Sequence, residues 1–161
     1  MAMSPTNREV IKPFTEEIVE KLVIIFKSKK LNKSLAQNIA ITLGRLGLIN
    51  PEGVAKHLDK IAKQWCVSLR YLKGDTNNDE KFQAYKGLCY TIGRNTNAII
   101  NEFPFFCSAV VHYKDPRQEL HLIFKGILQT FKMTCGEENW KAYISKFPDD
   151  LKSNLVHRFE L

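Results

Sequence analysis

The sequence has no apolar run that approaches the roughly 20 residues needed to cross a bilayer. Its first residues, MAMSPTNREV, lack the apolar block of a secretory signal peptide. We therefore expect no membrane contact and a place in the cytoplasm or nucleus. Residues 1–10 are small and polar, and we interpret them as a flexible N-terminal end or a remnant of cloning that lies outside the fold.

The sequence has few cysteines, and none lies close to another along the chain. The four cysteines form no CxxC pair and lie far apart within apolar stretches, at Cys66, Cys89, Cys107 and Cys135. A small secreted disulfide framework or a zinc site would need closer and more regular spacing. These residues are therefore predicted to be buried, reduced thiols.

Motifs of catalysis are also missing. The chain has no Gly-rich phosphate loop and no GxSxG nucleophile elbow, and its four histidines show no metal-ligand spacing to one another or to cysteine. Asp149 and Asp150 begin the last predicted helix, where acidic side chains favour the N-terminal end of the helix dipole. We expect no enzyme activity, no catalytic or metal-binding residue and no cofactor.

Charge is present in excess but is not concentrated. The 24 basic and 17 acidic residues give a formal net charge of +7, and the lysines and arginines are spread along the chain. The one dense cluster, from Lys27 to Lys33, falls at a helix end, where it complements the helix dipole. Direct binding of nucleic acid is not expected. The alternative is a basic helical-repeat scaffold that binds RNA or another protein, and it requires the basic side chains to converge on one groove.

Apolar residues recur at helical spacing almost everywhere, and no stretch alternates as a half-buried strand does. The pattern predicts an all-α fold. We expect eight helices in four pairs, at about 11–48, 51–94, 96–135 and 136–161. The first helix is predicted to bury Ile18, Leu22, Ile25 and Phe26.

Three helix starts are predicted from proline and capping residues. Pro51 should open a helix that continues without a break to Leu69. Pro104 should bend the fifth helix or mark its true beginning, and Asp115 with Pro116 should form the cap and first turn of the sixth. Trp65 and Trp140 fall at core positions of their helices.

A short motif occurs three times. The segments NIAITLG, GLCYTIG and GILQTFK each have an aliphatic residue at the second position and threonine at the fifth, which gives Thr42, Thr91 and Thr130. The offsets between these threonines are 49 and 39 residues. They bracket the period of about 40–47 residues that two-helix HEAT or armadillo units have. The repeat favours stacked helix pairs over a closed bundle.

Longer stretches resemble one family. The run SLAQNIAITLGRLGLINPEGVAKHLDKIAKQWCVSLR (34–70), the triplet Phe105-Phe106-Cys107 and the run GEENWKAYISKFP resemble the late repeats of the transportin family, nuclear import receptors of the importin-β superfamily. The likeness covers nearly the whole chain from about residue 11 in collinear order. It implies that the true C-terminus is present. It also implies a right-handed α-α superhelix whose concave face is lined by helices near 33–48, 78–94, 117–134 and 149–159.

The resemblance also implies a function. Receptors of this family bind proline-tyrosine nuclear localisation signals and release their cargo under the control of Ran-GTP while they shuttle between cytoplasm and nucleus. Ran-GTP and nucleoporins would bind parts of a full receptor that this chain lacks, and the chain itself is expected to be monomeric. By motif match, Ser34 and Asn38 lie at the edge of the cargo path. An amide suits that role because it both donates to and accepts from the main chain of an extended peptide, although Asn38 could instead bond locally within its helix.

Overall fold

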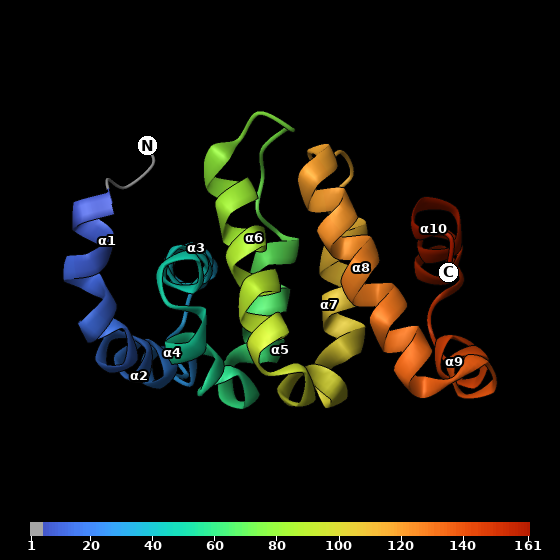
Figure 1. The fold of residues 1–161 in the computed structure, drawn as a ribbon, viewed down its shortest axis with the longest axis horizontal. Coiled ribbons are helices and arrows are strands. Elements are labelled where there is room, and N and C mark those ends of the chain that lie inside the picture. Colours follow the sequence, from blue (N-terminus) through green and yellow to red (C-terminus); the bar gives the residue numbers. More distant parts are fainter. Residues whose placement is uncertain (1–4) are drawn as a thin grey trace.

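The computed structural model describes residues 5–161, and every regular element within them is helical (Figure 1). The predicted all-α fold class is confirmed. The α-helices are α1 (Pro5–Ile11), α2 (Thr15–Phe26), α3 (Lys33–Ile49), α4 (Pro51–Ala55), α5 (Leu58–Arg70), α6 (Asp79–Arg94), α7 (Phe103–His112), α8 (Gln118–Cys135), α9 (Glu137–Ile144) and α10 (Asp149–Phe159). Two 3-10 helices join them, η1 (Lys12–Phe14) and η2 (Thr96–Glu102).

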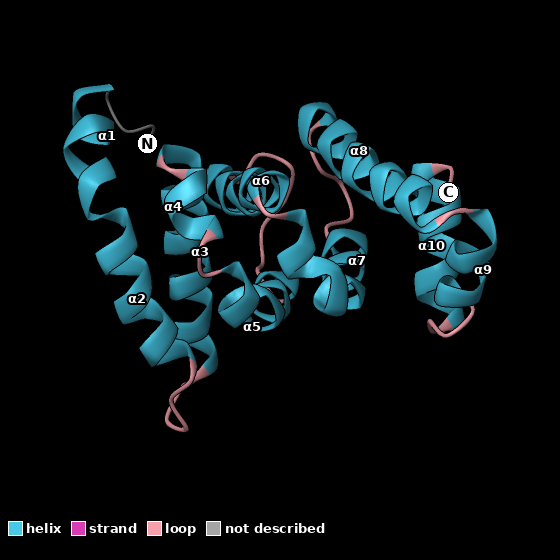
Figure 2. Ribbon diagram, turned by 60° about the horizontal axis from the view of Figure 1, so that its bottom comes forward, coloured by secondary structure: helices cyan, strands magenta, loops and turns pink. Residues whose placement is uncertain are grey.

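The helices stack as consecutive pairs. The first helices, α2, α5 and α7, pack in chain order against one another, and so do the second helices α3, α6 and α8, which we call the inner layer. Figure 2 shows α6 and α8 on one side of the molecule and α5 and α7 on the other. The pair α9 and α10 follows at the far end of the row (Figures 1 and 2). Each pair buries its apolar side on the next, as a helical-repeat stack requires.

The three threonines of the repeated motif make the same hydrogen bond. In each case the hydroxyl donates to the main-chain oxygen four residues earlier, Thr42 to Asn38, Thr91 to Gly87 and Thr130 to Gly126, with 2.8 Å between the oxygens. Threonine within a helix often satisfies its hydroxyl in this way. The motif copies therefore occupy equivalent places in α3, α6 and α8.

Two asparagines make the same pair of hydrogen bonds in successive repeats. The Asn50 side-chain oxygen accepts from the Gly53 N–H at the start of α4, and its amide donates to the oxygen of Lys12. Asn95 does the same at the start of η2, and its amide donates to the oxygen of Ala55. Each asparagine caps a helix start and ties it to the preceding repeat.

The core runs through the whole stack. Buried apolar residues form one cluster from Val19 in α2 to Phe159 in α10. Trp65 and Trp140 are both buried, as predicted, and the Trp65 indole N–H donates to the Ala40 oxygen at 3.0 Å. All four cysteines are free; three are buried and Cys135 is partly exposed, so the prediction for the thiols is confirmed for all but Cys135.

The buried side of α2 agrees with the prediction in part. Phe26 is buried, and Ile18 and Leu22 are partly buried against the core, but Ile25 is exposed. The fully buried positions also include Thr15, Val19 and Val23. Apolar residues surround most of this helix, so their spacing alone did not determine which side would be buried.

Two predicted helices differ from the structure in detail. A helix begins at Pro51, as predicted, but it ends at Ala55, and α5 begins separately at Leu58. The helix expected from Asp115 begins instead at Gln118. The Arg117 side chain holds this segment on the loop before α6, since it donates to the oxygens of Thr76 and Asn77 and pairs with Asp79.

The N-terminal residues differ from the prediction. Residues 5–10 were expected to lie outside the fold, but they form α1 together with Ile11. The chain then continues directly into η1, where Pro13 favours a helical start. Residues 1–4 lie outside the described residues.

Pro104 is at the beginning of α7, where its missing N–H costs no helical hydrogen bond. Of the two predicted outcomes for Pro104, the structure therefore shows that it marks the true start of the helix.

Candidate functional site

The two predicted cargo residues lie one helical turn apart on α3. The helix begins at Lys33 because the Asn32 side-chain oxygen accepts the Leu35 N–H at 2.8 Å. Ser34 and Asn38 are both exposed, on the side of α3 opposite the buried Ile39 and Leu43. The structure thus brings the two side chains together on one accessible surface.

The Asn38 side chain is not engaged within its own helix. Its main-chain oxygen accepts from Thr42, but its amide makes no hydrogen bond within residues 5–161. Two other exposed helical asparagines behave differently: Asn139 donates to the oxygen of Cys135, and Asn154 donates to that of Asp150. The Asn38 amide therefore has all its donors and acceptors available to a partner.

Ion pairs connect the inner layer from helix to helix. Arg45 of α3 pairs with Glu80 of α6, Lys86 of α6 pairs with Glu119 of α8, and Lys125 of α8 pairs with Glu160 beyond α10. The hydrogen bond from Lys86 to Glu119 raises the pKa of Lys86, and Lys125 lowers the pKa of Glu160. These cations are matched by carboxylates, so the inner layer does not present them as an open basic groove.

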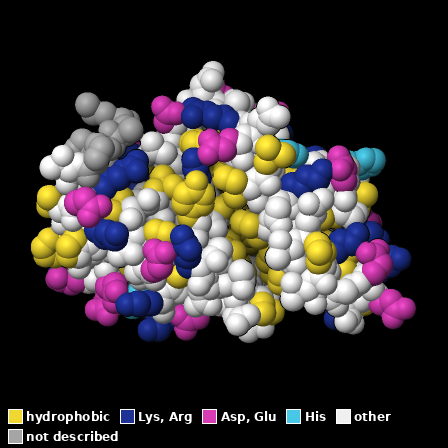
Figure 3. All heavy atoms as spheres, viewed as in Figure 1, with side chains coloured by type: hydrophobic (Ala, Val, Ile, Leu, Met, Phe, Trp, Pro, Cys, Tyr) yellow, Lys and Arg dark blue, Asp and Glu magenta, His cyan; other side chains and the backbone are white. Residues whose placement is uncertain are grey.

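The visible surface agrees with this interpretation. Figure 3 shows basic and acidic side chains interspersed over the face in view, with a band of hydrophobic side chains near its centre. The cluster of lysines after α2 is exposed, as expected for a solvated helix end.

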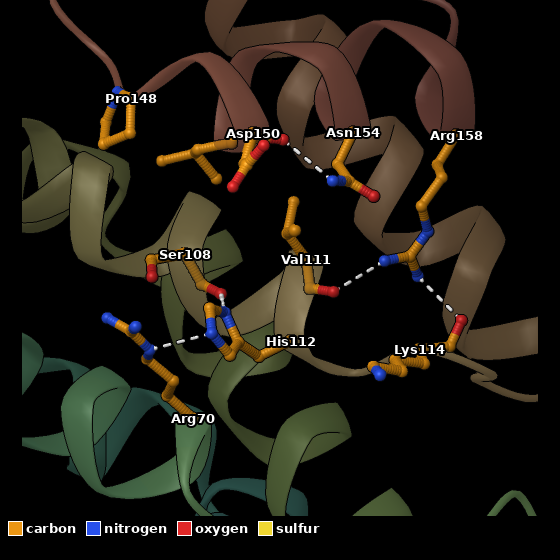
Figure 4. A pocket seen from close by; sticks show the side chains of 10 residues that line it. Arg70, Ser108, Val111, His112, Lys114, Pro148, Asp150, Asn154 and Arg158 are labelled. Carbon is orange, nitrogen blue, oxygen red and sulfur yellow. Dashed lines mark hydrogen bonds between the residues drawn. The ribbon is translucent and has the colours of Figure 1, made fainter.

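A cavity of about 680 Å³ lies between α7 and α10 (Figure 4). Three of its basic side chains, Arg70, His112 and Arg158, make hydrogen bonds within the fold. Arg158 donates to the oxygens of Val111 and Tyr113, each at 2.7 Å, and to that of Lys114, and so binds α10 to the end of α7. On the other wall, His112 Nδ1 donates to the Ser108 oxygen, which leaves Nε2 to accept from the Arg70 Nε at 3.2 Å.

The described residues show no metal site and no membrane-spanning helix. Within residues 5–161, no three His, Cys, Asp or Glu residues gather closely enough to hold a metal ion. In the same part of the chain, each helix is too short or too polar to cross a bilayer. One feature was not predicted from the sequence, an apolar groove between α6 and α8. The sequence contains the glycines that line this groove, as part of the repeated motif, but it does not reveal the angle between the two helices.

Comparison with known proteins identifies relatives. The chain is 37% identical over 146 residues to Transportin-1 of Homo sapiens and of Mus musculus, a match that covers 91% of this chain and 16% of each relative. It is 36% identical over 130 residues to Importin subunit beta-2 of Schizosaccharomyces pombe, covering 80% of this chain and 14% of that protein. No family model matches the chain.

The paired helices and these matches together define a helical-repeat segment of the importin-β type. The chain belongs to the transportin family. It spans about one sixth of the length of the curated relatives that it matches.

Proposed function

We propose that this chain is the C-terminal segment of a nuclear import receptor that binds proline-tyrosine nuclear localisation signals. The receptor would carry cargo such as RNA-binding proteins through nuclear pores, shuttling between cytoplasm and nucleus under the control of Ran GTPase. The similarity to Transportin-1 and Importin subunit beta-2 supports this role. It is a binding role and needs no catalytic group.

The observation that carries the proposal is the unengaged Asn38 amide beside Ser34 on the exposed side of α3. An extended peptide presents main-chain N–H and C=O groups regardless of its side chains, and an amide can pair with both. One such contact contributes about 1 kcal/mol. The segment would therefore form the edge of a cargo path whose main affinity comes from other repeats.

Ran-GTP and nucleoporins are assigned to the rest of the receptor. The chain covers only 16% of its transportin relatives, so most of the receptor surface lies outside it. We propose no Ran site on these helices, and we expect the chain itself to be a monomer.

The decisive experiment compares two forms of the receptor with one labelled peptide. A fluorescein-labelled peptide with a proline-tyrosine signal is titrated against the intact receptor, with and without Asn38→Ala, and fluorescence anisotropy gives the dissociation constant. A weaker complex for the variant supports the assignment, and unchanged affinity would remove Asn38 from the cargo path.

RNA binding is the competing function. A single-stranded RNA probe should not bind the chain even at low salt, because Arg45, Lys86 and Lys125 on the inner layer are each paired with a carboxylate. Tight RNA binding that weakens steeply with added salt would favour the basic scaffold instead.

A further inference from the structure

The cavity between α7 and α10 brings together basic side chains from three parts of the chain. Arg70 ends α5, Lys114 follows the end of α7, and Arg158 lies in the last turn of α10. Figure 4 shows Arg70 and Arg158 on opposite sides of this cavity. We call it the α7–α10 cavity.

The charges of the α7–α10 cavity are not balanced within the fold. Elsewhere in the stack, three arginines pair with carboxylates: Arg45, Arg94 and Arg117. Within residues 5–161, by contrast, no carboxylate pairs with Arg70, Lys114 or Arg158. One acidic side chain, Asp150, lines the cavity, and in the same part of the chain it forms no ion pair either. Three cations therefore face one carboxylate, and the cavity keeps an excess of positive charge.

Most of the N–H donors of these cations are unused. A guanidinium has five N–H donors and an ammonium has three. Arg70 uses one of its five, from Nε to His112, and Arg158 uses three, to main-chain oxygens. Lys114 makes no side-chain hydrogen bond within residues 5–161. Because both terminal nitrogens of Arg70 are free, its guanidinium can bind an oxyanion through two parallel hydrogen bonds.

Arg158 is partly buried without a full counter-charge. Burial lowers the pKa of its guanidinium, and Asp115 acts in the opposite direction. The main-chain oxygens that it contacts carry only partial charges. A bound anion would supply the counter-charge that a partly buried cation lacks.

The wall formed by α10 offers acceptors. The Asn154 amide donates to the Asp150 main-chain oxygen, but the Asn154 side-chain oxygen and the Asp150 carboxylate have no hydrogen-bond donor within residues 5–161. In Figure 4 both side chains extend from α10 toward α7. A ligand made only of anionic groups would be repelled by Asp150, whereas a hydroxyl group would donate to it.

We propose that the α7–α10 cavity binds a polyol phosphate, such as an inositol phosphate, either free in solution or as the headgroup of a lipid. Its phosphate groups contact Arg70, Lys114 and Arg158, and its hydroxyl groups donate to Asp150 and Asn154. The cavity volume of about 680 Å³ lies within the range of small-molecule sites. This binding is independent of the cargo path on α3.

The lining favours this ligand over nucleic acid and over an acidic peptide. Among the described residues, no tyrosine, phenylalanine or tryptophan lines the cavity, so a nucleobase lacks its usual stacking surface. The cations surround the cavity from three elements and do not follow one line, as the acidic side chains of an extended peptide would require. A run of glutamates would also place a carboxylate against Asp150.

The test is isothermal titration calorimetry of the 161-residue chain with inositol trisphosphate, which carries both phosphate and hydroxyl groups. Lys114→Gln removes one cation without breaking a hydrogen bond of the fold, and Arg70→Gln removes another from α5. Lys152→Gln makes the same charge change on the exposed side of α10, outside the cavity, and is the matched control. Circular dichroism and thermal unfolding first establish that each variant is folded.

We expect the wild-type chain and Lys152→Gln to bind inositol trisphosphate alike. Lys114→Gln and Arg70→Gln should each bind it at least about tenfold more weakly, since one charge-assisted hydrogen bond contributes about that much. Inositol without phosphate should not bind. Equal losses in Lys114→Gln and Lys152→Gln would overturn the proposal, because the net charge of the chain would then account for the binding.

A second arm separates the two sources of the ligand. Phosphatidylcholine vesicles that contain phosphatidylinositol bisphosphate are sedimented with the chain, and vesicles with phosphatidylserine at equal charge are the control. Binding of the free trisphosphate without vesicle binding identifies a soluble ligand. Binding to the phosphoinositide vesicles alone, abolished by Lys114→Gln, identifies a lipid headgroup.

Two further outcomes would show that the proposal is wrong. One is the absence of binding to both the free trisphosphate and the phosphoinositide vesicles. The other is a fluorescein-labelled hexaglutamate peptide that binds the wild-type chain, loses its affinity in Lys114→Gln and is not displaced by inositol trisphosphate. The occupant would then be an acidic peptide.

Discussion

Gly87 touches the backbone of Gly44. A Cβ built on Gly87 would lie 1.8 Å from the Gly44 oxygen, and one built on Gly44 would lie 2.4 Å from the Ala84 Cα. The helices α3 and α6 therefore cross in direct main-chain contact, which only glycine permits at these positions. Both residues belong to copies of the repeated motif, so the motif encodes this main-chain contact between helices as well as the period of the stack.

Gly87→Ala should be strongly destabilising. The added methyl would overlap the Gly44 oxygen, and neither backbone can move without separating two packed helices. We expect a loss of about 3 kcal/mol or more in the free energy of unfolding, at the upper end of overpacking effects. Urea denaturation followed by circular dichroism measures it.

Gly126→Ala is the matched control for that change. The same methyl at Gly126 meets nothing within 4 Å, and alanine is favoured over glycine in a helix by about 1 kcal/mol. The variant should be as stable as the wild type or slightly more stable. If Gly87→Ala proved equally harmless, the close crossing of α3 and α6 would be wrong.

Arg158→Ala should loosen α10. The guanidinium donates to three main-chain oxygens at the end of α7, and its removal leaves those acceptors to water or unpaired. Hydrogen bonds from a charged donor contribute about 1.5–3 kcal/mol, so we expect a loss of about 2 kcal/mol. Amide hydrogen exchange should rise in α10 and at the end of α7.

Ser153→Ala on the exposed side of α10 is the reference variant for that experiment. It should leave exchange in both helices unchanged. Exchange that rose evenly over the whole chain in Arg158→Ala would mean that α10 does not open separately from the rest.

Tyr85→Phe should destabilise the contact between two repeats. The buried Tyr85 hydroxyl lies 3.0 Å from the oxygens of both Leu69 and Ala109, at the ends of α5 and α7. Phenylalanine keeps the ring but leaves two buried acceptors without this donor, which costs about 1–2 kcal/mol. Thermal unfolding measures the loss, and Tyr90→Phe on the exposed surface should show none.

The thiols should react in two classes. Burial raises the pKa of Cys66, Cys89 and Cys107, so at pH 8 almost none of each is thiolate, the reactive form. Cys135 is partly exposed. A disulfide reagent added to the native chain should label Cys135 first and the other three only on unfolding. Rapid labelling of all four would mean that the core opens readily.

Local features of the fold were predictable, and angles between helices were not. The threonine motif and the burial of Trp65 follow from spacing and side-chain chemistry. The placement of Arg117 over the loop before α6 depends on a contact between residues 38 positions apart, which overrode the helix start suggested by Asp115. Contacts of that kind leave no local signal in the sequence.

The candidate site was likewise predictable in part. The resemblance to transportins placed Ser34 and Asn38 on one helix, and helical spacing was enough to predict that they share a side. The apolar groove between α6 and α8 was missed because a glycine in a helix has the same appearance in sequence whether it permits a close crossing, as Gly87 does, or leaves a space, as Gly126 does. Only the divergence of α8 from α6 distinguishes the two cases.

Asn38→Ala should weaken a proline-tyrosine signal peptide by about 1 kcal/mol in the intact receptor, about a fivefold rise in the dissociation constant, without changing stability. This loss of binding free energy is small because the amide is exposed, so water can take the place of the peptide as its hydrogen-bond partner. Asn38→Asp should weaken binding as well, since a carboxylate cannot donate to a peptide carbonyl. Asn154→Ala, which removes an exposed amide already engaged with Asp150, should leave the affinity unchanged. Calorimetry on the four proteins decides the matter: if Asn38→Ala binds as the wild type does, the cargo peptide does not reach α3.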